Sequence, residues 1–332
     1  MTKPFAATNT TATAAAVDNA LSTVTAELTA VEERIDEVLL SREPRITEIA
    51  NYLIEAGGKR VRPAVALLVF RACGGSDPRD VVDLSVALEL IHSATLLHDD
   101  IIDSSDTRRG RASAPKRFGM PDTLVTGDFL FSRAFEICGR FEEQVVAWAA
   151  QACVQLTEGE VLQRRFRHNP AVTERDYEEI ISRKTASLFS AGARIACHLA
   201  GQSATDVERL AVCGQEIGLA FQMIDDVLDV TGEEESTGKD RGADLRDGNP
   251  SLPVVWGLGL AAVRTAFTET APGQPEVAAA LRAIEDAGLP RRIRELAAGH
   301  AARAEAVVES LEPSEHQRAL LLLISALIDR EF

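Results

Sequence analysis

The chain has 332 residues, of which 45% are hydrophobic and 26% charged, and its formal net charge at pH 7 is −16. This length allows a large buried core, in one big domain or two smaller ones. The negative charge argues against non-specific binding to nucleic acid or to an anionic membrane surface. A phosphate-bearing ligand would therefore need a metal ion or a local cluster of cations.

The five cysteines are scattered along the chain without a Cys-x-x-Cys pattern. We interpret them as small core residues in a reducing compartment. Residues 1–16 lack the continuous apolar segment of a signal peptide, and no apolar run reaches transmembrane length. A cytoplasmic location is therefore expected.

Residues 1–20 are rich in Thr and Ala, which predicts a disordered N-terminal extension. Beyond them apolar residues recur at three- and four-residue spacing, between glycine and proline breakers, and no alternating strand pattern repeats. We therefore expect one all-α domain over 21–332, with its site between facing helices. The pattern predicts helices over 21–40, 46–56, 61–72, 80–103, 121–138, 142–163, 174–199, 206–230, 252–267, 275–286, 290–311 and 314–330.

The segment 57–63, Gly-Gly-Lys-Arg-Val-Arg-Pro, joins two predicted helices. Its glycines allow an unusual turn, and Pro63 suits the first turn of a helix. Its three cations, Lys59, Arg60 and Arg62, lie beside the exposed backbone N–H groups of a helix start. This combination indicates an anion site, with a solvated basic turn as the alternative.

The segment 99–103, Asp-Asp-Ile-Ile-Asp, ends the helix predicted over 80–103. Residues four apart share a helix face, so Asp99 and Asp103 point the same way. His92 lies two turns before Asp99 on this face, although a lone histidine in such a helix is more often a core residue.

A second copy of the pattern, Asp-Asp-Val-Leu-Asp, occupies 225–229 in the helix predicted over 206–230. By the same spacing Asp225 and Asp229 share a face, and Gln222 shares a face with Asp225, Asp226 and Asp229. Two such faces opposed across a bundle would form a cage of hard oxygen ligands suited to Mg²⁺, which usually joins a few carboxylates to substrate phosphates. The surrounding cations argue against the alternative of two solvated acidic faces.

Further cations lie near the acidic segments. Arg108 and Arg109 follow the first copy directly, where they could clamp a phosphate or simply pair with the aspartates. Lys184 and Thr185 lie in a helix between the two copies. Lys239 lies in a polar loop after the second copy, and such a loop could close over a metal-bound ligand. For either lysine alone, an ordinary surface lysine is the alternative.

The sequence contains no Ser/His/Asp arrangement, Walker A motif, Rossmann fingerprint or Cys/His zinc set. Its carboxylates and cations suit removal of a diphosphate leaving group, with metal ions neutralising the charge that develops. One metal-dependent anion site and one purely basic anion site predict two diphosphate substrates held close together. The predicted reaction is a condensation.

These residues resemble those of the trans-isoprenyl diphosphate synthases, or polyprenyl synthetases, of medium- and long-chain bacterial type. The match runs from about residue 45 to about residue 260 and includes GGKRVRP, LLHDDIIDSSDTRRG, GDFLF, KTASLF, FQMIDDVLD and GKDRGADLRDG. The resemblance implies a large helical bundle around a deep central cavity, usually dimeric. It also implies head-to-tail condensation of isopentenyl diphosphate with an allylic diphosphate to give an all-trans polyprenyl diphosphate.

The resemblance assigns roles to individual residues. Six aspartates would hold Mg²⁺, roughly three ions per active site with substrate bound: Asp99, Asp100 and Asp103, then Asp225, Asp226 and Asp229. The allylic substrate would face Arg108, Lys184, Thr185, Gln222 and Lys239. Isopentenyl diphosphate would be held by Lys59, Arg62, His92 and Arg109. The residues expected to act in catalysis are Asp99, Lys184, Thr185, Gln222 and Asp225.

The side chains that precede the first acidic motif give a partial indication of product length. Ala94 and Thr95, one turn before Asp99, are both small, whereas short-chain farnesyl-type enzymes place bulk there. We therefore expect a product of geranylgeranyl length or longer, in the long-chain range. The floor of the cavity would lie deeper, where Phe129, Phe131 or Phe135 could supply it; ordinary core aromatics are the alternative for each. In 248–253, Gly-Asn-Pro-Ser-Leu-Pro departs from the family's frequent Lys-x-Thr-Leu-Pro.

Two alternatives remain. A class-I terpene cyclase shares the fold and the first acidic motif, and Glu233 matches the end of its second motif, but Asp229 occupies that motif's Ser/Thr position. A cyclase also needs no isopentenyl site. A non-catalytic subunit would lose motif residues, whereas none is lost here. The resemblance implies a homodimer, and a catalytic subunit that needs a different partner chain is the alternative.

Overall fold

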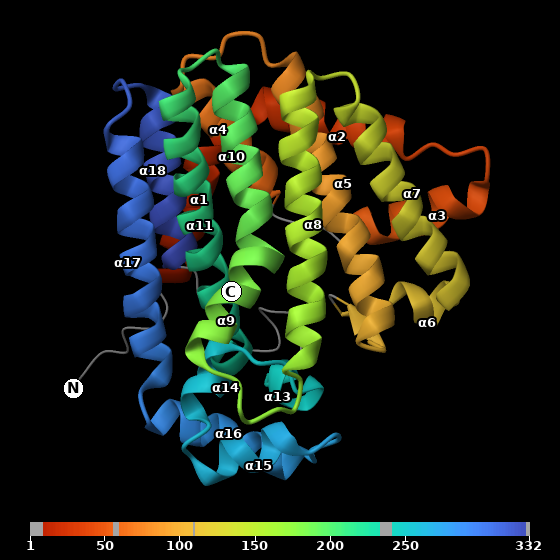
Figure 1. The fold of residues 1–332 in the computed structure, drawn as a ribbon, viewed down its shortest axis with the longest axis vertical. Helices are drawn as coiled ribbons and strands as arrows, with labels where there is room; N and C mark the ends of the chain where they lie inside the picture. Colours follow the sequence, from red (N-terminus) through yellow and green to blue (C-terminus); the bar gives the residue numbers. More distant parts are fainter. Residues whose placement is uncertain (1–8, 56–59, 109, 233–240, 330–332) are drawn as a thin grey trace.

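The structure is a computed structural model that describes residues 9–55, 60–108, 110–232 and 241–329, with side chains from residue 16 onward. Nearly all of the described elements are helices, and the longer ones run side by side (Figure 1). The predicted all-α class is therefore confirmed.

The helices are α1 Asn9–Ser22, α2 Thr25–Val38, α3 Pro44–Glu55, α4 Val61–Ala72, α5 Arg79–Ile102, α6 Ala114–Phe118, α7 Met120–Cys138, α8 Glu143–Arg165, α9 Glu174–Ile181, η1 Ser182–Ala186, α10 Ser187–Leu199, α11 Ala204–Thr231, α13 Ala243–Asp247, α14 Leu252–Gly257, α15 Ala261–Thr268, α16 Gln274–Asp286, α17 Leu289–Glu309 and α18 Glu315–Ile328. A two-stranded antiparallel hairpin, β1 Thr107–Arg108 and β2 Arg111–Ala112, follows α5.

The apolar spacing predicted the long helices to within a few residues. One prediction fails within 252–267, where the chain forms α14 and α15 with a turn between them. Gly257 ends α14, and a Cβ added there would lie 3.1 Å from Val263, so this glycine allows α14 and α15 to approach closely at the turn.

The expected disordered extension over 1–20 is wrong from residue 9 onward, because α1 covers Asn9–Ser22. Alanine-rich segments have high helix propensity, and α1 packs against α18, a contact that composition cannot reveal. Ala20 is fully buried. Residues 1–8 lie outside the described chain.

The main core fills the space among the long helices, and two smaller apolar clusters lie around α13–α16 and beneath α11 and α17. In Figure 1 the short helices α13–α16 form the lower end of the molecule. One described helix, α5, is long and apolar enough to cross a membrane, but 78% of its most apolar window is buried within the protein. That burial is typical of the central helix of a core.

Candidate active site

The first acidic motif lies at the C-terminal end of α5. Asp103 ends the helix, and its backbone N–H donates to the Asp99 carbonyl at 2.8 Å. Asp99 and Asp103 are both partly exposed, with 18% and 24% of their side-chain surface accessible. Asp100 is fully buried instead. The motif therefore has two partly exposed aspartates, four residues apart, and one buried aspartate between them.

Asp100 is paired with the hairpin rather than with the open face. The Nε of Arg108, on β1, donates to Asp100 Oδ1 at 2.6 Å. This ion pair connects the end of α5 to the strand that follows it. Arg109 lies outside the described residues.

A break in helical regularity places the next two functional residues. η1 is one turn of π-helix between α9 and α10, and such turns are frequent at functional sites. It lies very close to α8, because a Cβ added to Gly159 would come within 2.5 Å of the Lys184 backbone nitrogen. The glycine at this position is what lets η1 and α8 approach each other.

Lys184, on η1, connects α8 to the first motif. Its Nζ lies 2.7 Å from Gln163 Oε1 and 3.6 Å from Asp99 Oδ2, and it also pairs with Glu160. Burial lowers the pKa of this lysine, but the charges of Asp99 and Glu160 outweigh burial and raise the pKa above its usual value. Lys184 is therefore a charged, partly buried cation at the open face of the motif.

Thr185, the next residue of η1, faces the other acidic helix. Its hydroxyl donates to Gln222 Oε1 at 2.8 Å, and Gln222 Nε2 donates to Asp226 Oδ1 at 2.8 Å. Adjacent residues of η1 thus connect to the two acidic motifs: Lys184 contacts the first directly, and Thr185 reaches the second through Gln222.

The second motif, on α11, is held largely by backbone groups. Asp226 is 5% exposed and also accepts from the Leu252 N–H at 3.0 Å. Asp229 accepts from the N–H groups of Ala243 at 3.0 Å and Asp244 at 3.2 Å, at the start of α13. Asp225 is exposed to solvent.

Burial makes several of these carboxylates costly to ionise. It raises the pKa of Asp99 to about 6, although Lys184 opposes the shift. Burial raises the pKa of Asp226 to about 7 against the hydrogen bonds from Gln222 and Leu252. The pKa of Asp103 is also raised by burial. Carboxyl groups shifted in this way are common in functional sites.

The cations of the basic segment 57–63 have different surroundings. Arg60 has a left-handed backbone, φ +46°, and its side chain pairs with Glu32 at 2.6 Å and Glu89 at 2.5 Å. The expectation that all three cations form one anion site is therefore wrong for Arg60, because carboxylates of α2 and α5 already hold it. Lys59 lies outside the described residues.

Arg62 lies over aromatic rings, with its guanidinium 5.0 Å from the centre of the Phe189 ring and 5.9 Å from that of Phe221. Burial lowers its pKa, while the charges of Glu89 and Asp225 oppose that shift. His92 is half-buried on α5, and its carbonyl accepts from the Thr95 hydroxyl at 2.7 Å.

The residues expected to set product length lie on two helices that pack against each other, α5 and α7. Ala94 is fully buried and Thr95 half-buried on α5. Phe131 stacks on His98 with ring centres 5.9 Å apart, and Arg133 lies 5.1 Å over Phe129. Phe135 is 40% exposed, so it is not a core aromatic of the chain.

Sequence reasoning missed three residues at this site. Glu160 and Gln163 contact Lys184, and their spacing of three on an amphipathic helix was a usable signal. Arg167 pairs with Asp103 at 3.1 Å from a loop, where no periodic pattern could have indicated it. Lys239, which was expected here, lies outside the described residues.

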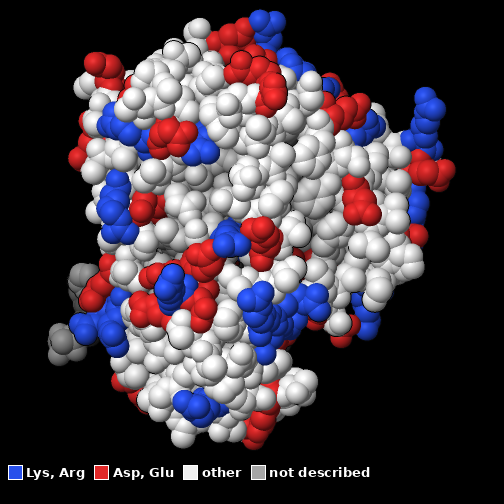
Figure 2. Space-filling view, in the orientation of Figure 1, with Lys and Arg blue, Asp and Glu red and all other residues white. Residues whose placement is uncertain are grey.

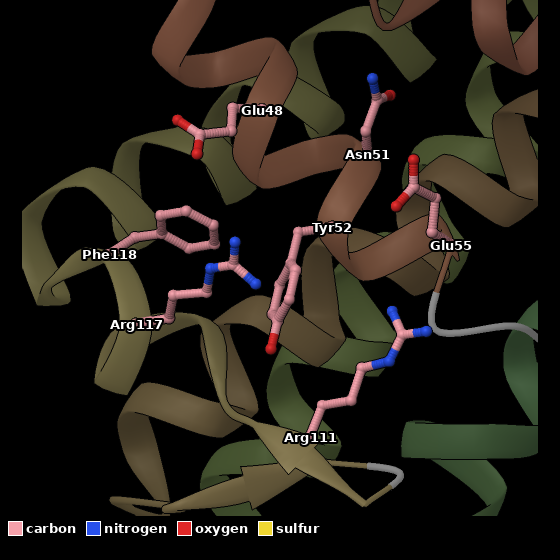
Figure 3. Close-up of a pocket in the computed structure, with 7 residues that line it drawn as sticks. All are labelled: Glu48, Asn51, Tyr52, Glu55, Arg111, Arg117 and Phe118. Atoms are coloured by element: carbon pink, nitrogen blue, oxygen red, sulfur yellow. The ribbon is translucent and has the colours of Figure 1, made fainter.

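A separate pocket of about 440 Å³ lies between α3, α6 and the hairpin, away from the acidic motifs (Figure 3). In it the Tyr52 hydroxyl donates to the Ala112 carbonyl at 2.7 Å, and Arg117 lies 4.4 Å over the Tyr52 ring. These contacts fix β2, and through it the strand that carries Arg108.

Comparison with known proteins identifies the arrangement. The family model described as polyprenyl synthetase matches residues 43–283. The chain belongs to the polyprenyl synthetase family. This membership confirms the resemblance found in the motifs and favours the synthase over the terpene cyclase.

Two relatives and one solved structure support the assignment over nearly the whole chain. A geranylgeranyl diphosphate synthase of Methanosarcina mazei is 35% identical over 91% of this chain and 95% of its own length. Heptaprenyl diphosphate synthase component 2 of Geobacillus stearothermophilus is 37% identical over 78% of this chain and 82% of its own. A polyprenyl synthase from Caulobacter crescentus CB15, complexed with calcium and isoprenyl diphosphate, has a TM-score of 0.91 and 32% identity, covering 95% of this chain and 98% of the other.

The protein is therefore a prenyltransferase that joins isopentenyl diphosphate head-to-tail to an allylic diphosphate. Members of the family use a divalent metal ion with these substrates.

Proposed function

We propose that the allylic diphosphate binds between α5, η1 and α11, and that the product is an all-trans polyprenyl diphosphate of geranylgeranyl length or longer. The observation that carries this proposal is the position of η1. Lys184 contacts Asp99 of the first motif, and Thr185 contacts Gln222, which bonds Asp226 of the second. One π-helical turn thus links the two acidic motifs.

We propose Mg²⁺ as the metal, held by Asp99 and Asp103 on one side and by Asp225 and Asp229 on the other, with roughly three ions per site. Among the described residues, no three His, Cys, Asp or Glu side chains form a ready-made metal cluster. This fits Mg²⁺, which usually takes one or two protein carboxylates and completes its coordination with substrate phosphates and water. The partly buried hard oxygens of Asp99 and Asp103 suit such an ion. When bound, it would neutralise negative charge on the departing diphosphate.

The chain's own cations would hold the allylic diphosphate. Lys184 keeps its charge because of the raised pKa, so its ammonium can donate to phosphate oxygens. Arg108 would add a fixed guanidinium, oriented by Asp100. Thr185 and Gln222, bonded to each other, would present a hydroxyl and an amide to the carbon that loses the diphosphate.

The reaction then follows from these positions. The allylic C–O bond breaks, and diphosphate leaves with the electron pair. The double bond of isopentenyl diphosphate attacks the resulting allylic cation to form the new C–C bond. A proton is lost from the isopentenyl unit to the departing diphosphate, which restores a double bond. Residues that exclude water here would protect the cation from hydrolysis.

Isopentenyl diphosphate would bind beside this site, at Arg62 and His92, with Lys59 and Arg109 completing the set. Arg62 is close enough to Asp225 for their charges to interact, which supports binding of the two substrates near each other. Arg60 is left out, because Glu32 and Glu89 hold it.

The growing prenyl chain would run along α5, past Ala94 and Thr95, into the expected central cavity. Neither side chain is large enough to stop it one turn below Asp99. We therefore propose that the product is in the long-chain range.

We propose that residues 21–332 form one domain that works as a homodimer in the cytoplasm. Large apolar side chains are exposed along α7 and α8, among them Leu124, Val125 and Phe135 on α7 and Val154 and Val161 on α8. Figure 2 shows a largely uncharged area over these helices, interrupted by an acidic group. Such a surface suits a second copy, and a heteromeric partner is the alternative. The described cysteines are all free, as expected in a reducing compartment.

The test is incubation of the purified chain with Mg²⁺, isopentenyl diphosphate and farnesyl or geranylgeranyl diphosphate. Products are dephosphorylated and sized by chromatography, and light scattering reports the assembly. A discrete long prenol from a dimer of this chain supports the proposal. A folded protein that elongates no primer would contradict activity of the chain alone and indicate a missing partner.

A further inference from the structure

Arg167 lies in the turn between α8 and α9, where sequence periodicity gives no indication of function. The turn follows Arg165, the last residue of α8, and includes His168, whose backbone is left-handed at φ +55°. Figure 1 shows α13 beneath this end of α8. The turn therefore lies between the first acidic motif and the segment that follows the second.

The Arg167 guanidinium joins two parts of the molecule. Its Nη1 donates to Asp103 Oδ1 at 3.1 Å, and its Nε donates to the Asp247 carbonyl at 2.9 Å. About 79% of the side chain is shielded from solvent, since 21% of its surface is accessible. A partly buried charged hydrogen bond of this kind orients both acceptors.

A second contact holds the same two segments together. The His168 N–H donates to the Gly248 carbonyl at 3.0 Å. Gly248 has φ +67°, and a Cβ added there would lie 2.3 Å from the His168 ring, so only glycine fits against the turn. The turn and the segment beginning at Asp247 therefore pack backbone to backbone.

The segment 242–252 is in turn tied to the second motif at both ends. At its start Gly242 and Ala243 donate to Asp229, and at its end Leu252 donates to Asp226. Hydrogen bonds thus join Asp103 through Arg167 to Asp247, and the backbone of this segment connects Asp247 to the groups that bond the aspartates of α11.

We propose that Arg167 is a positioning residue for the allylic diphosphate. It orients the Asp103 carboxylate and fixes the first motif relative to the segment that follows the second. Lys184 contacts the opposite end of the first motif, at Asp99, so the motif is held at both ends by cations from separate elements. This inference rests on the proposed allylic role of the first motif.

The test compares Arg167→Gln with Arg165→Gln, a matched control. Arg165 is exposed, has no ion pair among the described residues and lies two positions away, so both variants remove the same charge. We expect Arg167→Gln to raise the KM for the allylic diphosphate and the half-saturating Mg²⁺ concentration about tenfold. The KM for isopentenyl diphosphate, kcat and Tm should change little. Calorimetry with farnesyl thiodiphosphate and Mg²⁺ should show the same loss of affinity without turnover.

Arg167→Lys separates position from charge. A lysine keeps the charge but cannot hold Asp103 and the Asp247 carbonyl with a planar fork, so its allylic KM should lie between those of the wild type and Arg167→Gln. If Arg167→Gln does not fold, this variant decides the question alone, and wild-type constants would overturn the inference.

Other outcomes are distinguishable. Equal constants for Arg167→Gln and Arg165→Gln, or equal losses for both substrates together with a lower Tm, would overturn the inference while the wild type still made product. A wild type that makes no polyprenyl diphosphate would instead contradict the proposed function.

Discussion

The two acidic motifs have nearly the same sequence, but the protein neutralises them in different ways. In the first, each aspartate has a cationic partner: Lys184 for Asp99, Arg108 for Asp100 and Arg167 for Asp103. In the second, Asp226 and Asp229 accept from an amide and from backbone N–H groups. The difference indicates that side-chain charges neutralise the first motif, while the dipoles of amide and backbone N–H groups hold the second in place.

The largest effect should come from removing one proposed metal-binding carboxylate from each motif. Asp99→Ala and Asp225→Ala should each lower kcat/KM at least about a thousandfold, because charge on the leaving diphosphate would lose its metal partner. Steady-state assays with saturating Mg²⁺ measure this. Asp286→Ala, an exposed aspartate outside the site, is the control. Near-normal activity in either variant would remove that motif from the proposed metal site.

The helix leading into each motif offers a second contrast. Ala94 and Thr95 precede the first motif by one turn. Phe221 precedes the second motif by one turn, and the centre of its ring lies 5.4 Å from the centre of the Phe189 ring. Placing bulk before the first motif with Ala94→Phe should shorten the product by one or more isoprene units. Because Ala94 is fully buried, Thr95→Phe serves as a companion less prone to overpacking. Unchanged product length in both would place the cavity wall elsewhere.

Thermal stability should distinguish the buried Asp226 of the second motif from the exposed Asp225. Asp226→Ala removes the acceptor of two hydrogen bonds and should cost roughly 2 kcal/mol, lowering Tm by about 5 °C. Asp225→Ala, at an exposed position, should leave Tm within about 1 °C. Thermal unfolding measures both. A similar Tm for the two variants would mean that the bonds to Gln222 and Leu252 do not stabilise the fold.

An effect of similar size, confined to part of the pH range, concerns Asp99. Because burial raises the pKa of Asp99 to about 6, the folded chain binds this proton more tightly than the unfolded chain. The free energy of unfolding should therefore fall as pH rises from about 4 to about 6. Asp99→Asn lacks this carboxyl group, so its free energy of unfolding should not show this fall. Without metal, the variant should be more stable than the wild type by about 2 kcal/mol at pH 7 and equal to it near pH 4.

Urea unfolding in EDTA measures this difference. Asp286→Asn is the control, because its stability relative to the wild type should not change between about pH 4 and pH 7. A variant less stable than the wild type at pH 7 would mean that the contact with Lys184 outweighs the cost of burying the charge.

The sequence predicted much of this molecule because its signals are local. Apolar spacing located α5 and α11, and four-residue spacing placed Asp99 and Asp103 on one face of α5. What the sequence could not supply depends on contacts between distant segments. The π-helical turn at Lys184 depends on close packing against Gly159, and the pairing of Arg60 with Glu32 and Glu89 depends on how α2 and α5 are placed.

Arg167 is the clearest example of this limit. It lies 64 residues from Asp103, in a turn without periodicity, and only the fold brings the two together. α1 was missed for a related reason, because its packing partner α18 lies at the other end of the chain.

The most direct test of the central claim is a crystal structure of the protein with farnesyl thiodiphosphate and Mn²⁺, the metal located by anomalous scattering. We expect Mn²⁺ on Asp99 and Asp103 and on Asp225, with Lys184 and Arg108 on the diphosphate and Arg167 beside Asp103. Metal bound away from these carboxylates, or a diphosphate bound without contact to Lys184, would contradict it.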